Sequence, residues 1–173
     1  MKKILSWNVI PNGPWGQSFV IGAVLYEDGE ETKRFLARCP IEGEASTWVK
    51  QNVLPLIRGI RQTHSSYEEM LRAFSKFYMD NRANADVIHM GLPSASKVVC
   101  DMYNFEYIDE WASLYPWLDI SSCLKLAAVD SVEEYNENHS IITKYPEIGG
   151  SCNPIYQCRA NALCYMDMIK NFN

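Results

Sequence analysis

Cysteine and histidine are the side chains of this chain with the most direct chemistry, because thiolate and imidazole groups bind transition metals and act as nucleophiles or bases. Cys152, Cys158 and Cys164 follow one another at steps of six residues. A step of six turns a helical side chain by roughly 240°, so these thiols do not share a face. The chain also has no Cys-x-x-Cys pair. The spacing therefore does not favour a zinc site, and we expect free thiols that pack as small apolar side chains.

Three segments place polar side chains where apolar strands or helices begin and end. The segment 4–14 (ILSWNVIPNGP) is a strand pattern followed by turn residues. The segment 87–97 (VIHMGLPSASK) has the pattern of a strand end that leads into a helix. The segment 152–162 (CNPIYQCRANA) stands at the start of the last predicted helix. Such boundaries are where sites are usually built, so these segments are the candidates for function.

Together the three segments resemble the motifs of DnaQ-like (DEDD) 3′-5′ exonucleases, and with the elements between them the resemblance covers most of the chain. In that family the first strand carries an Asp-x-Glu pair, as in D-x-E-T-x-G-P. The second motif supplies an Asp, and the third has the form H-x-P-x-Y-D-x-x-x-x-A. This chain has Asn8 and Ile10 at the first pair. It has Ser94 or a close neighbour at the second Asp, and Cys152 and Gln157 at the His and Asp of the third.

The resemblance implies hydrolysis of phosphodiesters with two divalent metal ions about 3.5–4 Å apart. Small divalent ions need anionic oxygen ligands, whereas Asn8 and Gln157 offer neutral amides and Ile10 offers no ligand. The Cys152 thiol is a soft ligand and a poor substitute for an imidazole base. We therefore predict an exonuclease-like domain without catalytic residues, metal or cofactor, which acts by binding. The resemblance also suggests an origin in a phage or another mobile element, where short domains of this family occur.

The alternative is an active metal-dependent exonuclease that recruits Mg²⁺ or Mn²⁺ through displaced ligands. Asp101 and Asp119 are the acids that could support residual activity. Asp119 precedes a predicted helix, so we interpret it first as an N-terminal cap. A third hypothesis is a scaffold element with an unrelated cleft.

Two candidates also have a purely structural interpretation. Asn8 lies in an apolar strand and could be a buried amide that bonds to neighbouring backbone. His89 ends an apolar strand, where it is either a packed structural histidine or a binding residue that faces the former catalytic cleft.

Five tryptophans and ten tyrosines indicate binding, because a domain of this size cannot bury every tryptophan. Trp15, in the turn that follows the first strand, is the binding candidate beside the former active site. The formal net charge is −5, which does not favour a protein that binds the phosphate backbone of nucleic acids. We therefore expect a protein partner, with single-stranded nucleic acid as the alternative. The oligomeric state stays open.

Apolar periodicity and turn residues predict the elements. Strands are expected at 4–9, 19–26 and 32–38, the last two joined by the hairpin signal Asp28-Gly29, and further extended segments at 86–90, 106–108 and 117–120. Ser46, Ser66 and Ser131 are expected to cap helices. Further helices are expected at about 95–103, 122–128 and 155–172.

The whole pattern predicts one α/β domain over residues 1–173, with a ribonuclease-H-like mixed sheet. Its first three strands would be antiparallel and the later ones parallel, with helices on both faces. The apolar run after Lys2 and Lys3 is broken too early for a signal peptide, and no segment reaches the roughly 18–20 apolar residues of a membrane span. We expect a cytoplasmic protein.

Overall fold

The computed structural model describes residues 3–112, 117–141 and 147–172. Its centre is a mixed sheet of five strands in the order β3-β2-β1-β4-β5. The strands are β1 (Lys3–Pro11), β2 (Ser18–Glu27), β3 (Glu30–Arg38), β4 (Ala85–His89) and β5 (Trp117–Asp119). β1, β2 and β3 pair antiparallel, β4 runs parallel to β1, and β5 runs parallel to β4. The predicted mixed α/β sheet is therefore confirmed.

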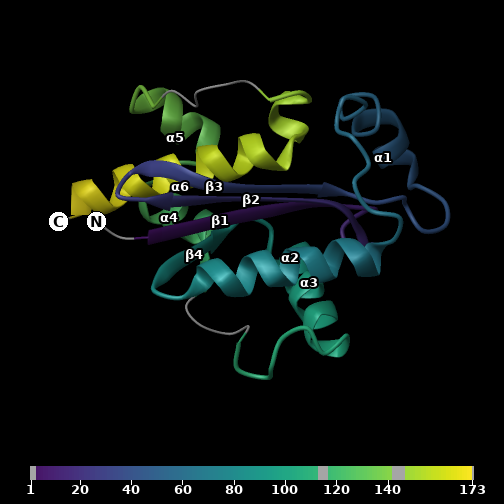
Figure 1. Cartoon of the computed structure of the whole chain (residues 1–173). Coiled ribbons are helices and arrows are strands. Elements are labelled where there is room, and N and C mark those ends of the chain that lie inside the picture. The colour runs from purple at the N-terminus through teal and green to yellow at the C-terminus, as the bar shows by residue number, and fades with distance from the viewer. Residues whose placement is uncertain (1–2, 113–116, 142–146, 173) are drawn as a thin grey trace.

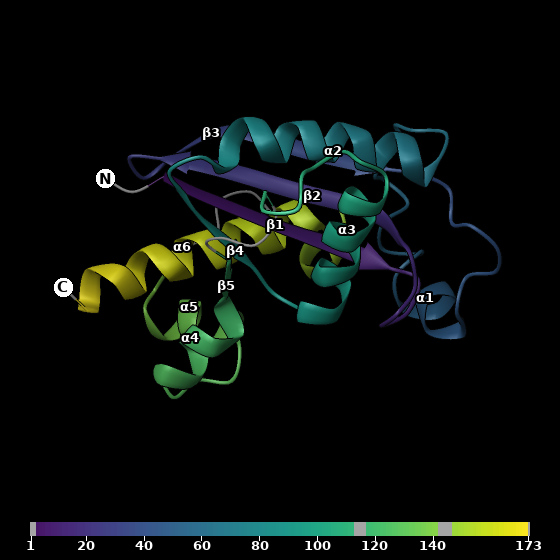
Figure 2. The ribbon, with the colours of Figure 1, turned by 90° about the horizontal axis from the view of Figure 1, so that it is seen from below.

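Helices cover both faces of this sheet (Figure 1). The helices are α1 (Thr47–Asn52), α2 (Tyr67–Arg82), α3 (Leu92–Asn104), α4 (Ile120–Leu126), α5 (Val132–Asn138), the 3-10 helix η1 (Gly150–Cys152) and α6 (Pro154–Phe172). α2 and α3 lie on one face, and α6 crosses the other face with α5 packed against it (Figures 1 and 2). The long last helix is thus the main cover of one side of the sheet.

Local sequence signals account for most of these boundaries. Asp28 and Gly29 both have positive φ, 52° and 85°, as the tight hairpin between β2 and β3 requires. Ser46, Ser66 and Ser131 each accept a hydrogen bond from a backbone N–H in the first turn of α1, α2 and α5. These three predicted caps are confirmed.

The strand predicted at 106–108 is wrong. Those residues lie in the turn that follows α3, where the Glu106 N–H donates to Tyr103 O and the Tyr107 N–H donates to Met102 O. This pair of bonds is a Schellman motif, and it places Glu106 in the left-handed region with φ 59°. Glycine usually occupies that position, so the sequence carries no sign of the turn.

The two faces of β1 serve two different cores. Trp7 is fully buried on the α2 side, where its ring lies 5.2 Å from Phe74 and 6.3 Å from Tyr78. Ile4 belongs to the core on the α6 side, with Ile155 among its members. Alternate residues of a strand point to opposite faces. Asn8, four residues after Ile4, therefore points toward α6.

Gly22 is what allows α6 to lie so close to the sheet. It pairs directly with Asn8 across β1 and β2. A Cβ atom at Gly22 would lie 2.6 Å from Pro154 Cβ and 3.1 Å from the Ile155 nitrogen. The Cys158 thiol, one turn further along α6, donates to Gly22 O at 3.4 Å. The first turns of α6 therefore rest on bare backbone, which brings the helix within side-chain reach of β1.

We predict that Gly22→Ala destabilises the fold by roughly 1–3 kcal/mol, because the added methyl group overpacks the contact with Pro154. Urea unfolding of the purified variant measures this change. In a double-mutant cycle, Pro154→Gly should relieve part of the cost, so the double variant loses less stability than the sum of the two single variants. Strictly additive losses would contradict the contact.

Candidate functional site

Asn8 of β1 and Gln157 of α6 hydrogen-bond to each other. The Asn8 amide donates from Nδ2 to Gln157 Oε1 at 2.6 Å, and Asn8 Oδ1 accepts from the Val9 N–H at 2.8 Å. Residues 149 positions apart in the chain are thus joined directly. Each amide oxygen already accepts a bond. The pair is satisfied without a cation between its members.

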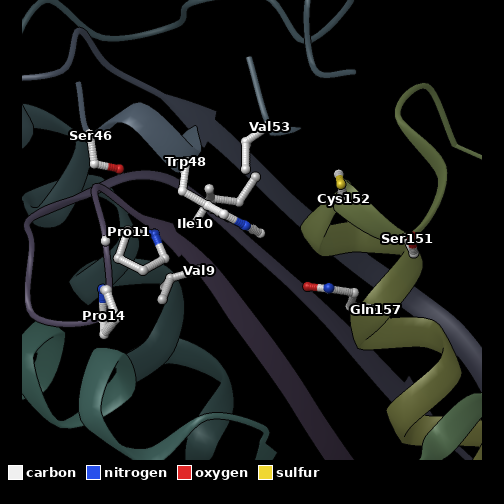
Figure 3. Close-up of a pocket in the computed structure, with 11 residues that line it drawn as sticks. Val9, Ile10, Pro11, Pro14, Ser46, Trp48, Val53, Ser151, Cys152 and Gln157 are labelled. Atoms are coloured by element: carbon white, nitrogen blue, oxygen red, sulfur yellow. The ribbon is translucent and has the colours of Figure 1, made fainter. Parts of the chain in front are cut away.

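A cavity of about 680 Å³ opens beside this amide pair, and we call it the strand-end pocket (Figure 3). β1 and the turn after it form one wall, α1 forms the second, and η1 with the start of α6 forms the third. None of the described lining residues is an aspartate, glutamate, lysine, arginine or histidine. They are Val9, Ile10, Pro11, Gly13, Pro14, Ser46, Trp48, Val53, Ser151, Cys152 and Gln157. The pocket is therefore mainly apolar, with the Gln157 amide at its edge.

Asn12 holds α1 at the pocket. Its side chain donates to Glu44 O at 3.0 Å and accepts from the Ser46 N–H at 2.8 Å, and Ser46 in turn caps α1. This contact brings Trp48 and Val53 to the pocket wall. Sequence reasoning did not identify these two lining residues. A serine cap predicts a helix but not the surface against which the helix packs.

A buried ion-pair network holds the third wall. Arg159 of α6 is 4% exposed, and its guanidinium forms two bonds to the Glu31 carboxylate, at 2.7 and 3.1 Å. It also pairs with Glu147, which stands just before η1. Burial disfavours the charge on Glu31, but bonds from Arg159 and Arg34 outweigh it and lower the pKa of Glu31. The network therefore fixes the segment that carries Ser151 and Cys152.

Ser94 and His89 do not line the described part of this pocket. Ser94 lies in the first turn of α3, on the other side of the sheet from α6. His89 is 1% exposed, and its ring lies 4.5 Å from Trp117 and 6.0 Å from Trp7. Because Trp7 points away from α6, the expectation that His89 could face the cleft is corrected to a position in the core. Burial lowers the pKa of His89, while the nearby Asp119 opposes this shift.

The two acids considered for residual activity are occupied by structural contacts. Asp101 accepts a hydrogen bond from the Tyr67 hydroxyl at 2.7 Å and pairs with Lys97 at 3.0 Å. Burial raises the pKa of Tyr67, and the bond to Asp101 adds to that effect. Asp119 accepts from the Ser121 N–H and hydroxyl at the start of α4. The predicted capping role of Asp119 is confirmed.

Two exposed tryptophans lie at or near the strand-end pocket. Trp48 lines it and is 65% exposed. Trp15 is 80% exposed at the tip of the turn whose residues Gly13 and Pro14 line the pocket. The expectation that some tryptophans reach the surface is confirmed, and two of them lie at or near one cavity.

Among residues 3–112, 117–141 and 147–172, no three His, Cys, Asp or Glu side chains are grouped so that they could hold a metal ion. No helix in these ranges combines the length and the apolar character needed to cross a membrane. A comparison of the chain with models of protein families and with curated proteins finds no match.

We predict that the free energy of unfolding falls as the pH drops below about 4.5, the ordinary pKa of Glu31. A carboxyl whose folded-state pKa is lowered stabilises the fold above its unfolded-state pKa, and the contribution is lost as it protonates. Arg159→Met should weaken this pH dependence and cost about 3 kcal/mol, because it removes the buried guanidinium that pairs with Glu31 and Glu147 and leaves them only the more exposed Arg34. Urea unfolding between pH 3 and 7 measures both effects.

Lys76→Met is the matched control, since Lys76 pairs with Asp80 on the exposed surface of α2. It should change stability by less than about 1 kcal/mol. An equal loss of unfolding free energy in both variants would show that the Arg159 network stabilises the fold no more than an exposed ion pair does.

Proposed function

We propose that this chain is a DnaQ-like domain of ribonuclease-H-like fold that has lost metal-dependent nuclease chemistry and binds a protein partner through the strand-end pocket. The mixed sheet, with three antiparallel strands followed by parallel ones, is consistent with a ribonuclease-H-like fold. The observation that carries the proposal is the 2.6 Å bond between Asn8 and Gln157.

The bond matters because of where it lies. The motif resemblance assigns Asn8 and Gln157 to two metal-binding acids that come from opposite ends of the chain, and the fold brings these two residues together. Two carboxylates at that separation would repel each other unless a cation or a proton lay between them. Two amides bond to each other instead. The neutral pair therefore stabilises the docking of α6 on β1 where charged acids would need a metal ion.

The lining of the pocket favours a protein over a nucleic acid. No described lining residue is a lysine or an arginine, and the whole chain has a formal net charge of −5. Backbone phosphates need cations to replace their counterions. An apolar pocket with exposed tryptophans at its edge offers the aromatic anchors that protein partners use. We therefore propose that an uncharged, apolar segment of the partner enters the pocket.

The nuclease half of the proposal is tested with end-labelled single-stranded DNA and RNA in Mg²⁺ or Mn²⁺. We expect no shortening by the wild-type chain. The near-isosteric double variant Asn8→Asp/Gln157→Glu should lose about 1–3 kcal/mol of stability at pH 7, since the amide bond becomes a repulsion. Millimolar Mn²⁺ should raise the melting temperature of that variant only. Cation-dependent shortening, or a Mn²⁺ shift of the wild type, would refute the proposed loss of metal chemistry.

The binding half is tested by capture of a stoichiometric protein from the native host on immobilised variants. Trp48→Glu places a charge at the pocket edge and should weaken capture by about tenfold or more, because the carboxylate loses hydration in the complex. Leu126→Glu is the control, since Leu126 is 81% exposed on α4 and should leave capture unchanged.

Thiol labelling shows whether the captured protein occupies the pocket itself. In a Cys100→Ser background, which removes the exposed cysteine, the captured protein should slow the alkylation of Cys152. Equal capture by Trp48→Glu, or capture that nuclease treatment abolishes, would contradict a protein partner at this pocket.

A further inference from the structure

A second hollow lies on the side of the molecule that α2 and α3 cover, away from the amide pair, and we call it the α3 groove. It has a volume of about 540 Å³ and lies where the end of α3 and the turn after it meet α2. Met79 of α2, Tyr103 of α3 and Tyr107 of the turn form its apolar surface. Glu106 and Asp109 are the charged residues among its described lining.

Aromatic side chains are unusually exposed around this groove. Tyr103 is 50% exposed and Phe105 is 43% exposed, and the Phe105 ring stacks on Tyr107 with a centroid distance of 5.7 Å. Trp111, four residues beyond Tyr107, is 73% exposed. Neighbouring exposed aromatic rings are typical of surfaces that contact other molecules.

The charged residues of the segment 103–112 itself are all acidic. Residues 103–112 contain Glu106, Asp109 and Glu110 but no lysine or arginine. All three acids are exposed, and none of them forms an ion pair with a residue that the structure describes. Glu106 occupies the left-handed position of the Schellman motif, where a glycine is usual. The groove therefore presents exposed carboxylates, without an ion pair to any described residue, next to exposed aromatic faces.

The same surface already binds one cation from its own chain. The Arg72 guanidinium lies 5.3 Å from the centre of the Tyr107 ring and pairs with the Glu68 carboxylate at 3.1 Å. An arginine is thus held between an aromatic ring and a carboxylate. The lining of the groove contains a second ring and a second carboxylate, those of Tyr103 and Glu106.

We propose that the α3 groove is a docking site for a basic segment of a partner protein. Lysine or arginine side chains of that segment pair with Glu106 and Asp109 and lie on the exposed ring of Tyr103. Charge complementarity selects this occupant, because an acidic groove repels phosphates and leaves its carboxylates unpaired against an apolar peptide. The proposal concerns a different surface from the strand-end pocket and does not depend on it.

The test uses a short fluorescent peptide in which arginines alternate with leucines, with a glutamate-for-arginine peptide as the negative probe. Binding is followed by fluorescence anisotropy and mapped by amide chemical shifts in the full chain. We expect the basic peptide alone to bind, with shifts concentrated in residues 103–111. Glu106→Gly/Asp109→Asn should weaken binding by about fivefold or more. Glycine suits the left-handed turn, so this variant should keep its melting temperature.

The matched control is Glu133→Gln/Glu137→Gln, which removes the same number of exposed acids from α5. It should bind the basic peptide as the wild type does. Equal weakening by both double variants would show attraction to the net negative charge alone and would overturn the proposal. Shifts centred on the strand-end pocket, or binding of both peptides with equal affinity, would overturn it as well.

Discussion

The position of α6 on the sheet depends on one hydrogen bond and on one absent side chain. Asn8 of β1 donates to Gln157 of α6, and Gly22 beside Asn8 leaves the space that lets the helix approach. The third wall of the strand-end pocket lies at the start of α6, so its distance from β1 depends on this contact. If α6 stood further from β1, Gln157 would not reach Asn8, and the wall with Ser151 and Cys152 would move away from Ile10 and Trp48.

The nature of that contact also constrains the chemistry of the pocket. Neutral amides satisfy each other directly, whereas acids in the same place would need a cation to hold them together. Ile10 and Cys152 also line the cavity, and neither side chain contributes an anionic oxygen to it. The buried charges of this region lie elsewhere, in the Arg159 network that fixes the approach to η1. The molecule thus separates a charged structural support from an uncharged pocket.

Two surfaces with opposite properties result. The strand-end pocket is apolar and lacks lysine, arginine and acidic side chains among its described lining, while the α3 groove combines exposed rings with exposed carboxylates. The two surfaces share no described lining residue, so a partner at one surface leaves the other accessible. This separation is possible because the two faces of β1 serve two independent cores, with Trp7 on one side and Asn8 on the other.

The sequence predicted the Asp28-Gly29 hairpin, the serine caps and the last helix from residues close together in the chain, and the mixed sheet from the order of its elements. It also identified Asn8 and Gln157 as candidates. Only the tertiary structure decided that these two amides bond to each other, that His89 lies in the core, and that Trp48 and Val53 complete a pocket. It also showed that residues 106–108, predicted as a strand, form the turn after α3. The physical reason is that packing joins residues far apart in the chain, whereas periodicity and capping report only on neighbours.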